Sequence, residues 1–201
     1  NAPALEGDLI FPDFNADKVE RIVIRRPGSI TSDGQPQTIE LVRDEANLDV
    51  WRMTQPYTAT AANAKDGLPI SSFLTSTFLG DIETMTIGAT INAGEMSPEE
   101  ISAIEDSSIE VKMAMKDRPP VSFALSNKTT GEKRSLYFRF PSERRFFLVP
   151  VNPFGSFMVD ARAYLDPRLF PMTIRDIESI RIVSFSDQSD TPSIAVSIFR
   201  L

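Results

Sequence analysis

Apolar residues alternate with polar ones along much of this sequence, and a two-residue period is typical of strands that bury one face. In the first third of the chain the alternation predicts three strands, at residues 18–26, 38–43 and 50–54. Turn-forming residues separate these strands, and Pro56 follows the third. The region is therefore expected to form an antiparallel β-meander.

The same alternation returns in the second half of the chain. It predicts strands at residues 109–115, 121–125, 136–140 and 145–151. The polar segment 127–133 is predicted to be the turn between two of them. A further turn is expected at residues 152–155, followed by a strand or short helix at residues 157–164.

Two segments between the meanders favour helices. Residues 63–79 carry apolar side chains at helical spacing, with Pro69 in the first turn and Gly80 as the stop. The second helix is expected to begin at the segment Ser-Pro-Glu-Glu, residues 97–100, which has the pattern of a capping box. Its apolar face would consist of Ile101 and Ile104.

The expected fold class is therefore α+β, a mostly antiparallel sheet with meander connections and two or three helices. The whole chain, residues 1–201, is interpreted as a single module with a sub-boundary near residues 90–108.

Two segments near the ends of the chain share the same order of residues. Phe11-Pro12 leads through Asp17 to Val-Glu-Arg-Ile, and Phe170-Pro171 leads through Asp176 to Ile-Glu-Ser-Ile. Both segments continue into a predicted β-hairpin that ends in arginine, and the offset between them is about 158 residues. We therefore predict a Phe-Pro and β-hairpin repeat at both ends, with residues 169–201 as the start of a second repeat unit.

Composition narrows the chemistry. The chain has 201 residues, 41% of them hydrophobic and 24% charged, which is typical of a folded protein. It contains no histidine and no cysteine, which excludes Ser-His-Asp triads, thiolate nucleophiles and the usual zinc ligands. We therefore assign no catalytic residue, no metal and no cofactor, and expect a protein that is not an enzyme.

The charge is unevenly distributed. The net charge is −7, with ten basic and twenty acidic residues up to position 120 and eleven basic and eight acidic residues after it. An acidic chain without a basic helix is a poor match for nucleic acid, so no nucleic-acid partner is expected.

A basic tract in the second half is the one candidate surface. Arg134, Arg139, Arg144 and Arg145 are interleaved with aromatic residues across two predicted strands. The favoured interpretation is an amphipathic hairpin with its arginines together on one solvated face. The alternative is a surface that docks a protein or an anionic lipid headgroup, because arginine and aromatic residues are enriched at interfaces.

Several short motifs resemble a bacterial family described as domain of unknown function 4340. The matching residues are Phe11-Pro12, Ile22-Val23-Ile24, the segment Trp-Arg-Met-Thr-Gln-Pro at 51–56, Ala62-Asn63, Leu148-Val149-Pro150, and Arg-Leu-Phe-Pro at 168–171. The likeness spans residues 9–182. The family's usual Tyr-Gly-Leu is replaced here by Ile104-Glu105-Asp106, so the chain would be a divergent member.

The resemblance implies an extracytoplasmic protein, often held by a membrane anchor and associated with ABC-transporter systems of the gliding or exporter type. It implies no catalytic residues. The polar stretch that follows Asn1 without an initiator Met agrees either with a trimmed chain or with a mature chain whose signal or anchor segment has been removed.

The function expected from these observations is a non-catalytic extracytoplasmic interaction or scaffold domain, accessory to a membrane ABC transporter and bound to other proteins. Two alternatives stay open. One is a carboxylate-dependent hydrolase acting on glycan or peptide, and the other is a domain that binds a small ligand or glycan.

Overall fold

The computed structural model describes residues 5–31, 33–56, 67–130, 135–150, 177–185 and 193–200. The chain divides into two compact units, Asn1–Leu165 and Asp166–Leu201. The predicted turn at residues 152–155, the element at 157–164 and the segment Phe170-Pro171 lie outside the described residues.

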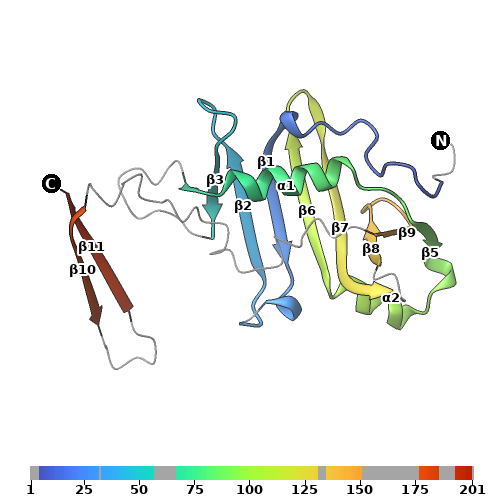
Figure 1. Ribbon diagram of the computed structural model, residues 1–201. Coiled ribbons are helices and arrows are strands. Elements are labelled where there is room, and N and C mark those ends of the chain that lie inside the picture. Colours follow the sequence, from blue (N-terminus) through green and yellow to red (C-terminus); the bar gives the residue numbers. More distant parts are fainter. Residues whose placement is uncertain are drawn as a thin grey trace. The chain divides into compact units, whose positions relative to one another are not determined.

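The first unit contains a nine-stranded antiparallel sheet, which confirms the α+β class with a mostly antiparallel sheet (Figure 1). Across the sheet the strands follow the order β4-β3-β2-β1-β6-β7-β8-β9-β5. Their bounds are β1 Val19–Arg26, β2 Gln37–Arg43, β3 Trp51–Gln55, β4 Leu68–Pro69, β5 Ala89–Asn92, β6 Ser108–Met115, β7 Arg118–Thr130, β8 Ser135–Arg139 and β9 Arg145–Val149.

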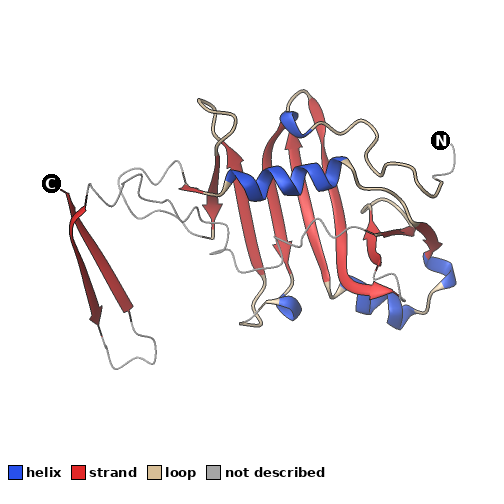
Figure 2. Ribbon diagram, in the orientation of Figure 1, coloured by secondary structure: helices blue, strands red, loops and turns tan. Residues whose placement is uncertain are grey.

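Two α-helices lie among the described residues, α1 at Ser72–Glu83 and α2 at Pro98–Glu105, together with three short 3-10 turns (Figure 2). The turns are η1 Ala16–Lys18, η2 Gly28–Ile30 and η4 Ala93–Glu95. The capping box predicted for the second helix is confirmed: the Ser97 hydroxyl accepts from the Glu100 N–H, and the Ser97 N–H donates to the Glu100 carboxylate.

The predicted bounds of the first helix are wrong. Pro69 lies in β4, opposite Arg52 of β3, and α1 begins three residues later. Strand pairing holds this segment extended, and the residue before a proline disfavours helical backbone in any case. Gly80 is not the stop, because α1 continues through it to Glu83.

Helical spacing groups Phe73 with Phe78 on the apolar face of this helix, and this grouping is wrong. Phe73 is 74% exposed, whereas Phe78, Leu79 and Ile82 are buried. A glycine inside a helix costs about 1 kcal/mol relative to alanine. Burying a large apolar side chain contributes about 1.5–3 kcal/mol, so the packing of these three residues outweighs the cost of Gly80.

One face of the sheet carries the main core. Alternate residues of the central strands point to this face and are buried beneath α1: Ile22, Ile24, Ile39, Leu41, Val111, Met113, Phe123 and Leu125. This arrangement confirms the alternation predicted for residues 109–115. It also leaves the alternate set of side chains, mostly polar or charged, on the opposite face.

The N-terminal segment closes the core at one end. Ile10 donates its N–H to the Met85 carbonyl, and the Phe11 ring lies 5.5 Å from the ring of Phe123 and 5.7 Å from that of Phe138. Phe138 is fully buried and stacks on Phe123 with a centroid distance of 5.0 Å. These rings tie the lead-in of the chain to the second meander.

The polar segment predicted as a turn at residues 127–133 is partly strand, because β7 continues to Thr130. Ser126 explains the irregularity there: its hydroxyl accepts from the Lys128 N–H and hydrogen-bonds the Ser107 hydroxyl, where the register of β7 against β8 shifts.

The second unit contains a hairpin of β10 Ile177–Phe185 and β11 Ser193–Arg200. The hairpin predicted at the C-terminal end of the chain is therefore present.

The aromatic cluster should dominate the stability of the first unit. We expect Phe138→Ala to lower the free energy of unfolding by about 3–5 kcal/mol, because it removes a fully buried ring and leaves a cavity. Phe73→Ala is the matched control and should change it by less than about 0.5 kcal/mol, since Phe73 is exposed. Urea unfolding followed by tryptophan fluorescence measures both, and similar losses would contradict this description of the core.

Candidate interaction groove on the open sheet face

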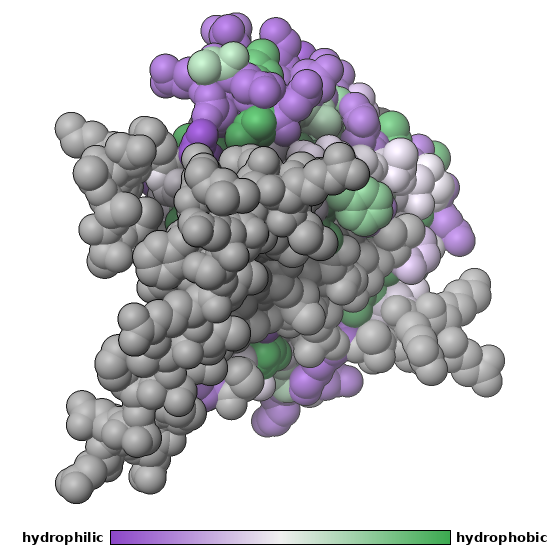
Figure 3. Space-filling model, turned by 60° about the vertical axis from the view of Figure 1, so that its left-hand side comes forward, coloured by the Kyte–Doolittle hydropathy of each residue, from purple (hydrophilic) through white to green (hydrophobic). Residues whose placement is uncertain are grey.

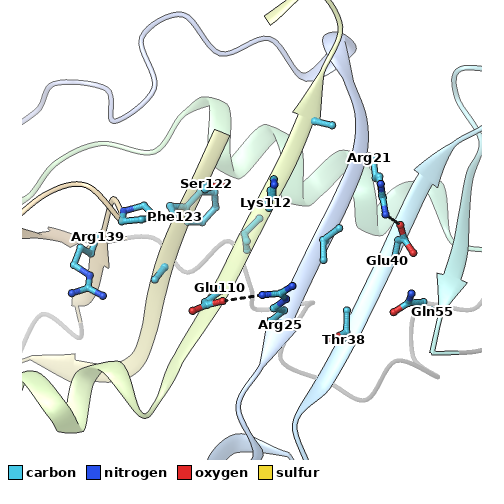
Figure 4. Close-up of a pocket in the computed structure, with 15 residues that line it drawn as sticks. Arg21, Arg25, Thr38, Glu40, Gln55, Glu110, Lys112, Ser122, Phe123 and Arg139 are labelled. Atoms are coloured by element: carbon cyan, nitrogen blue, oxygen red, sulfur yellow. Dashed lines mark ion pairs between the residues drawn. The ribbon is translucent and has the colours of Figure 1, made fainter. Parts of the chain in front are cut away.

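The sheet face opposite α1 is hollowed by a groove of about 580 Å³ (Figure 4). It crosses the middle of the sheet from β3 to β8, and in Figure 4 α1 lies behind the strands. The polar and charged residues that line it are Arg21, Arg25, Thr38, Glu40, Gln55, Glu110, Lys112, Ser122 and Arg139.

Small side chains form the floor of this groove. Register places Ala124 between Glu110 of β6 and Arg139 of β8, and Ser122 beside Lys112. Because the side chains at Ser122 and Ala124 are short, the long side chains on either side rise above them as walls. The hollow is thus a direct result of residue size along β7.

Ion pairs hold part of the wall in place. The Arg21 guanidinium pairs with Glu40, whose side chain is only 11% exposed. Arg25 faces Glu110 across the β1–β6 pair at 3.9 Å, and both of these side chains are about two-thirds exposed (Figure 4). The first pair is a fixed part of the wall, whereas the second is loose and solvated.

Lys112 stands at the centre of the groove, opposite Val23 on β1 and Ser122 on β7. Among the described residues no carboxylate lies within ion-pair distance of its ammonium group. The lining therefore contains four cations and two carboxylates, and one central cation without a carboxylate partner in the described part of the chain.

Helix α2 bounds the groove at the β8 end. The Arg139 guanidinium donates to the Glu105 carboxylate at 2.5 Å and lies 5.6 Å from the centre of the Phe146 ring. Phe146 is buried and meets Tyr137 edge-on at 6.0 Å. Burial raises the pKa of the Tyr137 phenol, and the negative charge of Glu100 on α2 adds to the increase.

The expectation that the arginines of residues 134–145 gather on one face is wrong. Phe138 pairs with Phe147, so Arg139 shares a face with Phe146, and Arg145 points to the other face. Arg145 bonds Glu143 and lies 5.0 Å from the Phe147 ring. Arg144 is exposed in the turn, and Arg134 lies outside the described residues. Of the three arginines that the structure describes, only Arg139 lines the groove.

Sequence reasoning missed the groove itself. Arg21, Arg25 and Lys112 are ordinary polar positions of alternating strands, and nothing in their spacing shows that β1 and β6 are neighbours. The signal that was available is the strong alternation of both strands, which places their charges on one side once the pairing is known.

The large hydrophobic side chains that are exposed among the described residues are Leu5, Leu9, Leu48 and Phe73. In the view of Figure 3 the described surface at the top is mainly hydrophilic, with apolar residues scattered through it.

Among the described residues no group of three or more acidic side chains is placed to hold a metal ion, and no helix there is long and apolar enough to span a bilayer. Comparison with known proteins gives no match to any family model, curated protein or solved structure.

The contact of Arg139 with α2 can be tested with Arg144 as the matched control, because Arg144 is exposed in the turn between β8 and β9. We expect Arg139→Ala to lower the free energy of unfolding by about 1 kcal/mol, because it removes a partly exposed ion pair and a cation–π contact. Arg144→Ala should change it by less than about 0.5 kcal/mol.

Urea unfolding measures both variants, and amide exchange in α2 reports the local effect. Faster exchange of α2 in the Arg139 variant alone is the expected result. If neither variant alters α2, the contact between Glu105 and Arg139 does not hold the helix.

Proposed function

We propose that this chain is a non-catalytic interaction or scaffold module of the extracytoplasmic side, accessory to a membrane ABC transporter. The observation that carries the interaction role is the groove: a charged, open hollow over the centre of a sheet whose other face is filled by the core. The location and the transporter association are supported by the resemblance of the motifs at residues 11–12, 51–56 and 148–150.

The architecture suits a scaffold. The groove is built on paired strands rather than on loops, so its wall residues keep fixed spacings. Both edges of the sheet are short, β4 with a proline and β5 with four residues. Short edge strands discourage uncontrolled strand addition, which leaves the open face as the surface for recognition.

A carboxylate-dependent hydrolase is the rival class, and the two groove carboxylates are its natural candidates. Glu40 and Glu110 are both turned toward arginines, Arg21 and Arg25. These contacts explain the two carboxylates as partners of cations in a binding surface.

The hairpin of the second unit supports a repeated architecture, and we propose that it starts a second copy of the first unit's β1–β2 element. In the first hairpin Ile22 lies opposite Leu41, and in the second Ile180 lies opposite Ile198. The first strands are offset by 158 residues and the second strands by 157, so the two registers match with a connection one residue shorter.

The interaction role predicts that a partner protein can be crosslinked to this chain in its native host. A photo-crosslinking amino acid would be placed, in separate variants of the full-length protein, at Ser122 in the groove, at Leu48 in the β2–β3 turn and at Phe73 on α1. We expect a crosslink to a membrane subunit of a transporter from at least one position, identified by mass spectrometry. No transporter subunit at any of the three would contradict the proposal.

The hydrolase alternative is tested on the same protein. Release of product from glycan or peptide substrates that disappears in both Glu40→Gln and Glu110→Gln, while the folded fraction is unchanged, would replace the proposal with an enzyme. We expect no release that depends on either residue.

The repeat predicts that strands equivalent to β6 and β3 flank β10 and β11. In the full-length protein, amides on both outer edges of the second hairpin should then be protected from exchange, as in β1, which pairs on both sides. The outer edge of β5 is the control and should exchange quickly, since β5 ends the sheet. Protection of the inner amides alone would contradict the repeat.

A further inference from the structure

We infer that the groove binds an extended acidic segment of a partner protein, laid across β1, β6 and β7 with Lys112 as its central anchor. This inference rests on the proposed interaction function and names the partner chemistry of the same site.

The groove differs in charge from the protein around it. Its lining has four cations and two carboxylates, whereas the first 120 residues of the chain carry twice as many acids as bases. A positive hollow in a negatively charged body attracts an acidic segment locally and repels the same segment elsewhere. Such charge complementarity determines where the segment binds more than how tightly it binds.

The cations are not equally available. Arg21 and Arg139 are engaged by Glu40 and Glu105. Arg25 has only the loose contact with Glu110, and such exposed pairs contribute at most about 1 kcal/mol, so an incoming carboxylate exchanges with Glu110 at little cost. Lys112 meets no carboxylate in the described part of the chain and is the first point of attachment.

The positions of these two cations fit carboxylates on one segment. Lys112 and Arg25 stand on adjacent strands, and Arg25 is opposite Glu110, two residues before Lys112. The cations are therefore offset diagonally. Diagonal neighbours in an antiparallel pair are separated by about 7–8 Å, close to the distance of about 7 Å between alternate side chains of an extended chain.

The length of the hollow sets the size of the segment. The part of the groove between β2 and β8 spans four strand spacings of about 4.8 Å, or about 19 Å. An extended chain of about six residues covers this length. Ser122 and Ala124 keep the floor low enough for a backbone to pass between the walls.

A polyphosphate fits this groove less well. Glu40 and Glu110 lie in the lining, and they repel a ligand that carries a charge at every unit. A segment with acids at alternate positions places neutral residues beside them. The ligand that fits the groove is therefore a protein segment, and an oligonucleotide serves as the competing ligand in the experiment.

The probe is a fluorescein-labelled hexapeptide of alternating glutamate and serine, titrated with the protein at low salt and followed by fluorescence anisotropy. Lys112→Glu should weaken binding by about tenfold or more, because it reverses the central charge. Lys116→Glu is the matched control: it makes the same charge change in the exposed turn after β6, outside the groove, and should weaken binding less than about twofold.

A third variant tests whether an additional available cation strengthens peptide binding. Glu110→Gln frees Arg25 and should tighten binding of the same peptide by about twofold to fivefold. A peptide with glutamine in place of glutamate should not bind. Thermal unfolding of each variant, measured separately, shows that a loss of binding is not a loss of fold.

Four outcomes would overturn the inference. The first is that the acidic peptide does not bind, and the second is that Lys112→Glu and Lys116→Glu weaken its binding equally. The third is that the glutamine peptide binds as tightly as the glutamate peptide. The fourth is that an oligonucleotide binds in a Lys112-dependent way while the peptide does not bind. Concentration-dependent dimerisation that Lys112→Glu abolishes, without peptide binding, would likewise replace the partner with a second copy. A transporter crosslink from Leu48 or Phe73 would still support the proposed function if the groove fails.

Discussion

The pairing of β1 with β6 is the constraint on which the rest of this structure depends. It joins two meanders that lie about ninety positions apart in the chain, and it does so in the middle of the sheet. Closing so long a connection is costly in chain entropy, so the pair must be secured by burial. Ile22 opposite Met113 and Ile24 opposite Val111, all buried beneath α1, supply that burial.

The same pairing creates the open face. Since side chains alternate along a strand, every register that places Ile24 against Val111 also places Arg25 against Glu110 and Val23 against Lys112. A slip of one residue would bury the charged set and expose the apolar one. The groove and the core are thus two results of one register, and substitutions that keep the core in place also keep the groove charges in place.

Local patterns predicted the elements well where a single physical rule governed them. Alternation found the strands, and the Ser97–Glu100 pair found the start of α2. The first helix failed because Pro69 and Gly80 were judged by local preference, whereas pairing with Arg52 and the burial of Phe78 and Ile82 decided their structure. The groove could not be predicted, because Lys112 acquires its neighbours only through long-range pairing.

The arginine tract shows why alternation alone does not fix a face across a turn. Within one strand, residues two apart share a face, but between strands the turn sets the register. Here Phe138 lies opposite Phe147, so Arg139 and Arg145 fall on opposite sides although both strands alternate as expected. Each arginine then finds a glutamate and an aromatic ring on its own side. Arg139 of β8 and Arg145 of β9 are therefore each paired with a nearby glutamate. The central strands differ, because Lys112 on β6 stands beside small residues on β7 and keeps its positive charge available to a partner.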